Sequence, residues 1–474
     1  MPGNSTYTRF MRAPSPTAVT SQAKLTTGPV GRTLWQNSWP MSMGLISVIA
    51  FNIVDTFYIG QLGADQLAAM GFCFPVIFIM GSMAIGLGNG SLSILSRAIG
   101  EGRPDRARRL VTNTMVLVSL LSFVLTGFMY IFSDEIFSLL RTPDHLMPYV
   151  DQYMDVWYAG LWFLITPVAA NYLIRANGEA IASSVLMLGA AAINAVLSPL
   201  LVFGLLGFPE MGISGAALAT IIARGTIAVS AIYYLGFRHN MMEVSLRAVQ
   251  VLPRHIQEIM RFAVPAALAQ MVTPLATALI VILLAGYGQD AVAGFTVGAR
   301  IETLSLVPFF AFQVGISPFI GQNVGANLPD RLAQAENWIW KFALFWGVIS
   351  AVLLISFGGA LGSLFTDDPE IIALTDQYLF IVSFGYIFAG VFHLSIGVLN
   401  PLGFPNLGAG LSFFRYIVLY AGLAWLFSSG AVLDSLTGPV GVFTAGAIAW
   451  IIAGLTGALL IHHRLPTRSP QQTD

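Results

Sequence analysis

The sequence predicts an all-α integral membrane protein whose twelve transmembrane helices form two parallel six-helix repeats. Three observations support this prediction. The chain is 56% hydrophobic and only 9% charged, whereas a soluble domain carries about 25% charged residues. It contains twelve apolar runs, each near the ~20 residues that cross a bilayer. A spaced residue pattern in its first half also returns in its second half without insertion or deletion.

The twelve apolar runs follow one another with short connections. Those of the first half cover about 33–60, 68–97, 107–132, 149–175, 180–207 and 211–237. Those of the second half cover about 257–286, 293–320, 332–357, 374–399, 405–428 and 439–462. We therefore expect an N-lobe over 33–237 and a C-lobe over 257–462, joined by a cytoplasmic linker at 238–256. Residues 1–32, rich in Ser, Thr and Pro, are expected to form a disordered tail, and residues 463–474 a second tail.

The repeat keeps one constant offset along the chain. The matched positions include Gly63 and Gly288, Asp65 and Asp290, Ala68 and Ala293, Gly90 and Gly315, and Gly100 and Gly325. With the same offset, a PDR triplet at 104–106 returns at 329–331, and a DQY triplet at 151–153 returns at 376–378. Agreement over such a distance indicates a duplication.

The charges predict the orientation. Lys and Arg collect in the first tail, in the loop after the second run, in the linker and after the last run, whereas the loops after the third and ninth runs are acidic. Basic loops stay in the cytoplasm, so both termini are expected there, in a multi-pass protein of the cell membrane. Because each half has an even number of runs, the two repeats share one topology.

Several functional classes lack support in the sequence. The only cysteine, Cys73, excludes a disulfide within one chain. No HExxH, P-loop or GxSxG motif is present, so we expect neither an enzyme nor ATP drive, and no cofactor. A net charge of −1 gives no indication of a nucleic-acid partner. Two parallel membrane repeats are typical of a secondary transporter that works by rocking of its halves, here expected to act as a monomer on small molecules.

Several local patterns resemble one known family. The run Val54-Asp55-Thr56 precedes IGQLGADQLAA, and IRANGE at 174–179, AINAVLSP around Asn194, GISGAALAT at 212–220, and GARIETLSLVP with IGQNVGA at 298–326 follow in order. Together they resemble the multidrug and toxic compound extrusion (MATE) transporters. The resemblance implies a V-shaped pair of six-helix lobes. It also implies export of amphipathic, often cationic compounds in exchange for protons or sodium ions.

Asp55 is the first candidate for coupling. A carboxylate near a helix centre in the bilayer costs about 2.5–3.5 kcal/mol, so one that is kept there is usually functional. An alternative is an interfacial acid that only bonds to the helix end. The resemblance adds Asn194, Ser198 and Thr220, because family members with a sodium site carry an N-x-x-x-D pattern on the fifth span and a threonine on the sixth. Here Ser198 replaces that aspartate. The replacement favours coupling to a proton on Asp55 over coupling to a sodium ion held by Asp55, Asn194 and Thr220. The alternative is that these polar residues only form hydrogen bonds between helices.

The second half has its own charged candidates. Arg300 and Glu302 are two residues apart and should point in different directions on a helix. Arg415 is a candidate partner for Glu302, and His393 is the one histidine of the tenth span. These residues either hold the lobe together or take part in transport. Arg224 of the sixth span needs a partner that the sequence does not name.

The leading interpretation is a secondary antiporter that exports amphipathic, cationic drugs or metabolites in exchange for protons. The first alternative is a flippase for lipid-linked precursors. It would need a strongly basic cleft, for which only Arg224, Arg300 and Arg415 are intramembrane candidates. A receptor or scaffold without transport would not require costly charges inside the membrane in both halves.

Overall fold

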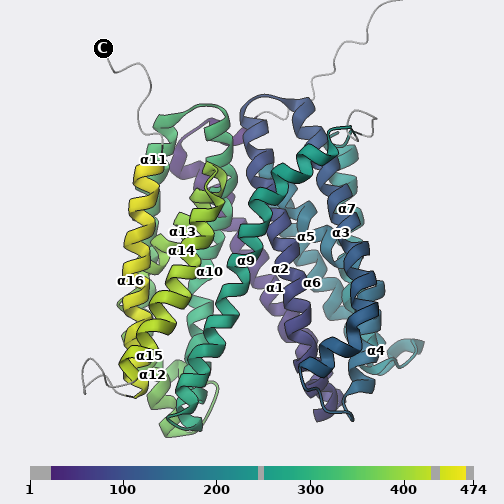
Figure 1. Cartoon of the computed structure of the whole chain (residues 1–474), viewed down its shortest axis with the longest axis vertical. Coiled ribbons are helices and arrows are strands. Elements are labelled where there is room, and N and C mark those ends of the chain that lie inside the picture. Colours follow the sequence, from purple (N-terminus) through teal and green to yellow (C-terminus); the bar gives the residue numbers. More distant parts are fainter. Residues whose placement is uncertain (1–22, 244–249, 429–437, 466–474) are drawn as a thin grey trace, which may run out of the picture.

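The computed structural model describes residues 23–243, 250–428 and 438–465, and the regular structure of this part is helical throughout. Its helices form two lobes that converge at one end and diverge toward the other (Figure 1). The first lobe contains α1 (Val30–Leu62), α2 (Ala64–Gly100), α3 (Pro104–Leu139), α4 (Met147–Ala159), α5 (Leu161–Ala176), α6 (Ala180–Phe203), and α7 (Gly212–Tyr233) with its extension η3 (Tyr234–Arg238). Short turns are η1 (Lys24–Thr26) and η2 (Leu205–Gly207).

The second lobe repeats this order. It contains α9 (Leu252–Ala285), α10 (Gln289–Gly325), α11 (Pro329–Gly362), α12 (Pro369–Ser383), α13 (Tyr386–Leu402), α14 (Pro405–Phe413), η4 (Phe414–Ala421), α15 (Gly422–Ser428) and α16 (Pro439–Arg464). The α2–α3 and α10–α11 loops lie where the lobes converge, which we call the basic end because of its arginines. The α3–α4 and α11–α12 loops lie at the opposite, acidic end.

The predicted twelve spans are confirmed. Ten helical segments are long and apolar enough to cross a membrane, and two bent pairs bring the number to twelve in the described residues. The bends, 54° between α4 and α5 and 64° between α12 and α13, were not predicted. At the first bend, a Cβ on Gly160 would collide with the Ile221 side chain of α7, so close packing requires glycine there.

The expected boundaries of the tails and linker need correction. Residues 1–22 lie outside the described residues, but Lys24–Thr26 form a turn and α1 begins at Val30, so the expected tail to residue 32 is too long. Leu25 is only 5% exposed. The linker is also shorter than 238–256, because η3 ends at Arg238 and α9 begins at Leu252.

The segment 23–29 contacts both lobes at the basic end. On the first lobe, the Lys24 ammonium pairs with Glu179. On the second, Leu25 N donates to Gln322 Oε1 at 3.0 Å, and Asn323 Nδ2 donates to Leu25 O at 3.1 Å. The Gln322 amide then donates to Ala176 O of α5 at 2.8 Å. The segment and Gln322 therefore join the lobes where they converge.

The duplication is visible in the packing between lobes. Helices α1 and α9 each begin against the opposite lobe. A Cβ on Gly90 of α2 would lie 2.9 Å from Ala263 N of α9. A Cβ on Gly315 of α10 would lie 2.8 Å from Ser38 Cα of α1. Gly315 is the repeat counterpart of Gly90, and Ala263 is that of Ser38, so the same contact occurs twice with the lobes exchanged. Small residues at such contacts let membrane helices approach closely.

Candidate functional site

The Asp55 carboxyl lies inside the first lobe, on α1 near the acidic end. Its side chain is 5% exposed. The Asn194 amide of α6 and the Tyr153 hydroxyl of α4 face it, and Arg224 of α7 supplies a positive charge within electrostatic range. Three helices, α4, α6 and α7, therefore place polar groups around the carboxyl that α1 carries, although these residues are far apart in the chain.

The expected polar partners lie together on α6 and α7. Asn194 Nδ2 donates to Thr220 Oγ1 at 3.3 Å, and both residues are nearly inaccessible. Ser198 is one helical turn from Asn194 and fully buried. Asp55 Oδ1, Asn194 Oδ1 and Ser198 Oγ are buried oxygens without a hydrogen-bond partner among the described residues. Buried polar atoms are usually paired, so these oxygens mark a place that can receive a proton or a hydrogen-bonding molecule.

The partner of Arg224, which the sequence does not name, is Asp55. The Arg224 guanidinium lies over the Phe51 ring, 5.4 Å from the centroid, and interacts electrostatically with Asp55. Thr220 and Arg224 are four residues apart on α7 and share a face. A fixed positive charge beside the only carboxylate of this group opposes the uptake of any cation there, a sodium ion as much as a proton.

The second lobe holds a different constellation around Glu302 of α10. The Tyr378 hydroxyl of α12 donates to Glu302 Oε2, and Trp450 Nε1 of α16 donates to Glu302 Oε1 at 3.2 Å. The Arg415 guanidinium of η4 lies 3.7 Å from the centroid of the Trp450 ring. In the described residues Glu302 and Arg415 form no ion pair, so the expected pairing is indirect: Trp450 contacts both charges.

Aromatic rings enclose the Arg415 guanidinium. Besides Trp450, the Tyr416 ring lies at 4.4 Å and the Tyr420 ring at 5.0 Å. His393 of α13 packs on the same indole, with ring centroids 5.4 Å apart. Arg300, in contrast, is exposed on α10 and does not join this group. The structure therefore brings together Glu302, Arg415 and His393 and separates Arg300, as the two-residue spacing from Glu302 predicts.

Two tyrosines that contact Asp55 and Glu302 were not predicted from the sequence. Tyr153 faces Asp55 in the first lobe, and Tyr378 bonds to Glu302 in the second. They are the matched tyrosines of the duplicated DQY triplet. The acids themselves are not repeat-related. The duplicated triplet was therefore the signal that could have identified these residues.

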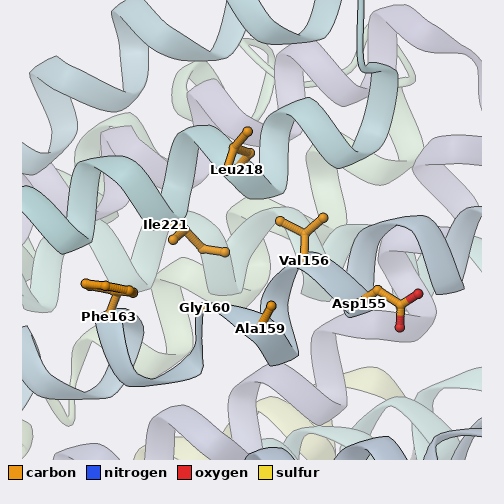
Figure 2. Close-up of a pocket in the computed structure, with 7 residues that line it drawn as sticks. All are labelled: Asp155, Val156, Ala159, Gly160, Phe163, Leu218 and Ile221. Atoms are coloured by element: carbon orange, nitrogen blue, oxygen red, sulfur yellow. The ribbon is translucent and has the colours of Figure 1, made fainter.

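A pocket of about 380 Å³ lies at the α4–α5 bend, against α7 (Figure 2). Its labelled lining is apolar except for Asp155 at one edge. None of the candidate site residues lines it. The pocket therefore follows from the bend and does not belong to the site around Asp55.

Both membrane-spanning lobes match one family of known proteins. A family model, MatE, matches residues 40–200 and 265–426, which is one block in each lobe and most of the chain. The chain belongs to the MATE family. This makes it a membrane transporter and not an enzyme, as the sequence predicts. The two matched blocks contain all of the candidate residues except Thr220 and Arg224.

Individual MATE relatives differ in their reported cargo. The chain is 33% identical over 414 residues to a protein of Shewanella oneidensis named FAD transporter, covering 87% of this chain and 91% of the relative. It is 25% identical over 448 residues to the probable multidrug resistance protein YoeA of Bacillus subtilis, covering 91% and 96%. Among solved structures, the Vibrio cholerae MATE transporter VcmN in the bent form matches with a TM-score of 0.86 at 28% identity, covering 94% of this chain and 98% of that chain.

Proposed function

We propose that this MATE transporter is a proton-coupled antiporter that exports amphipathic, cationic small molecules from the cytoplasm by alternating access. The observation that carries the proposal is the Asp55 carboxyl, which is buried among polar groups and has one oxygen without a hydrogen-bond partner among the described residues. A carboxyl that is kept in such a place is suited to taking up and releasing a proton.

One feature of the site favours protons over sodium. Ser198 occupies the position where a second carboxylate would complete a sodium site, so Asp55 is the only carboxylate of this group. Sodium is a hard cation that prefers several oxygen ligands and negative charge. A single carboxylate with few further oxygen ligands provides little attraction for it. Proton transfer needs only the one carboxyl.

The arrangement of the lobes supports alternating access with the basic end in the cytoplasm. The lobes converge at the basic end and diverge toward the acidic end (Figure 1). With both termini in the cytoplasm, this is the state that releases the exported compound outside. Protonation of Asp55 and binding of the compound would then each bias one equilibrium between two states of the lobes. The protein acts as a monomer in this proposal.

The direct test is efflux of ethidium from energised cells, comparing wild type with Asp55→Asn under a proton gradient and under a sodium gradient. We expect proton-driven efflux in the wild type, no response to sodium, and loss of efflux in Asp55→Asn. Thr226→Val is a matched control, because Thr226 lies on exposed α7 surface and bonds only to its own helix at Ile222 O. Sodium-driven efflux that survives Asp55→Asn would place coupling elsewhere, with Glu302 the first residue to test.

A flavin dinucleotide is a second candidate cargo. The 33% identical relative is named FAD transporter, and the match extends over nearly the whole of both chains. A guanidinium enclosed by aromatic rings, such as Arg415, is also suited to an aromatic anion. Competition between FAD and ethidium for uptake into inverted vesicles distinguishes the two. Transport of FAD without transport of ethidium would show that the cargo is a flavin dinucleotide and not an amphipathic cation. Proton coupling at Asp55 would then be tested with FAD in place of ethidium.

The flippase alternative has less support. It needs arginines that converge on one basic cleft. Arg224 faces Asp55, Arg415 lies among aromatic rings in the other lobe, and Arg300 is exposed. No observation on these three residues favours a shared pyrophosphate site.

A further inference from the structure

A large cavity lies at the basic end, outside the site around Asp55. It has a volume of about 1210 Å³ and is lined by α2, α3, the beginning of α9, and the α13–α14 connection. It is therefore bounded by both lobes. Its arginines are Arg97, Arg103, Arg106, Arg109, Arg254 and Arg261. Only two carboxylates, Glu101 and Glu258, share this lining.

The two carboxylates are already engaged by two of the arginines. Glu101 Oε2 pairs with Arg103 at 3.3 Å and with Arg106 at 3.2 Å. Glu258 Oε1 pairs with Arg106 at 2.6 Å. Arg109 pairs with Glu243, outside the lining, at 3.6 Å. Among the described residues Arg97, Arg254 and Arg261 form no ion pair, so the cavity keeps a positive excess at these three arginines.

Arg97 brings an unsatisfied donor to this cavity. Its Nε donates to Pro401 O, across the boundary between α2 and α13. One of its terminal nitrogens is buried and has no hydrogen-bond partner among the described residues. A buried charged donor without a partner is unfavourable. An anion in the cavity would supply the missing acceptor.

Arg254 and Arg261 of α9 lie on the exposed side of the same cavity. Val264 and Leu268, 44% and 58% exposed, follow Arg261 at spacings of three and seven residues, on one face of α9. Arg261 lies where this exposed apolar face begins, the position expected of an arginine that meets lipid headgroups.

We propose that this cavity binds a phosphate group through Arg97, Arg254 and Arg261. The phosphate comes either from an anionic phospholipid headgroup or from a soluble phosphate. Arginine is the side chain best suited to bind phosphate oxygens, and the volume exceeds that of many small-ligand pockets. Because Arg97 belongs to one lobe and contacts Pro401 of the other, the ligand stabilises the contact between the lobes at the basic end. The proposal does not depend on which cargo or ion is transported.

The competing explanation is that these arginines only set the membrane orientation. Three forms of the full-length protein separate the two explanations: wild type, Arg254→Ala/Arg261→Ala, and the control Arg32→Ala/Arg238→Ala. The control removes two exposed arginines near the same end that do not line the cavity. A fourth form, Arg254→Lys/Arg261→Lys, keeps the charges and tests whether the alanine variant fails only because it folds poorly.

The lipid arm uses nanodiscs of mixed phosphatidylglycerol and phosphatidylcholine, followed by native mass spectrometry of the lipid that the protein retains. The soluble arm uses phosphatidylcholine nanodiscs and the rise in Tm on adding inorganic phosphate, compared with chloride at equal ionic strength. Losing two arginine contacts at the membrane surface is expected to weaken binding about 30-fold. The lysine form should retain more binding than the alanine form.

Retention of phosphatidylglycerol that is lost only in Arg254→Ala/Arg261→Ala supports the site with a lipid as its source. A phosphate-dependent rise in Tm that is lost only in that variant supports it with a soluble source. Equal behaviour of the cavity variant and the control variant in both arms would overturn the proposal. Absence of any phosphate or phosphatidylglycerol effect in the wild type would overturn it as well.

Discussion

Arg331 holds the segment 23–29 on the second lobe, and its loss should open the basic end. The Arg331 guanidinium donates to three carbonyl oxygens of this segment, those of Leu25 at 3.1 Å, Thr27 at 3.2 Å and Gly28 at 2.6 Å. Because Lys24 of the same segment pairs with Glu179 of the first lobe, these bonds join the lobes. Arg331→Ala removes them without touching the site around Asp55.

The size of the effect follows from the environment of these bonds. A hydrogen bond to a charged group contributes about 1.5–3 kcal/mol when protected, and exposed ones contribute less. Two of the three bonds are exposed and one is part-buried. We therefore assign about 2 kcal/mol to the set, which corresponds to about a 30-fold shift in the equilibrium between joined and separated lobes.

Ser96 gives a way to measure this shift. It is fully buried on α2 and lies against Gly321 of the other lobe, so it becomes accessible only when the lobes separate. Cys73 is the only native cysteine and is buried. In a Cys73→Ser/Ser96→Cys background, maleimide labelling should be up to about 30-fold faster with Arg331→Ala. The control is Lys341→Ala, which removes an exposed charge from α11, the helix that carries Arg331. Equal labelling rates in the two variants would show that the Arg331 bonds do not hold the lobes together.

Three further predictions concern packing, capping and pH. In the Cys73→Ser/Ser96→Cys background, Gly90→Leu should accelerate labelling, because the leucine side chain would collide with the α9 backbone and push the lobes apart. Gly71→Leu is the control, because a side chain there meets open space. Equal labelling rates in the two variants would contradict this prediction. Asp368 accepts from Glu370 N at 2.9 Å as an N-cap, so Asp368→Ala should cost about 1 kcal/mol of stability, measured as a lower Tm than that of Asp367→Ala. Partial burial lowers the pKa of His239 from 6.5. As the pH falls below 6.5, His239 binds a proton more readily in the unfolded chain than in the folded one, so acidification destabilises the folded state. The Tm of the wild type should therefore fall more on acidification than the Tm of His239→Gln. Equal falls in Tm would count against this prediction.

The fold was largely predictable because membrane spans leave a strong signal. Each spanning helix satisfies its own backbone and presents apolar side chains to lipid, so local composition reveals it. The constant offset between matched positions also predicted related lobes, and the Gly90 and Gly315 contacts show that relation in three dimensions. The bends at Gly160 and between α12 and α13 could not be predicted, because they arise from contacts between helices that are distant in the chain.

The site was predictable where spacing along one helix determined it. Asn194 and Ser198 share a face of α6, and the structure places Asn194 beside Asp55 and Thr220. Arg224 was named without its partner, although its four-residue spacing from Thr220 already placed both on one face. The contacts between the lobes could not be predicted from the sequence for a different reason. The order of segment 23–29 depends on bonds to Gln322 and Arg331, which are far from it in the sequence.

Proton coupling through Asp55 is tested most directly by measuring proton movement during transport. Purified protein in liposomes that contain a pH-sensitive dye should acidify or alkalinise the interior when ethidium is added, in the direction opposite to the ethidium movement. We expect this proton movement in the wild type without sodium, and its loss in Asp55→Asn. Ethidium transport without proton movement, or proton movement that continues in Asp55→Asn, would contradict it.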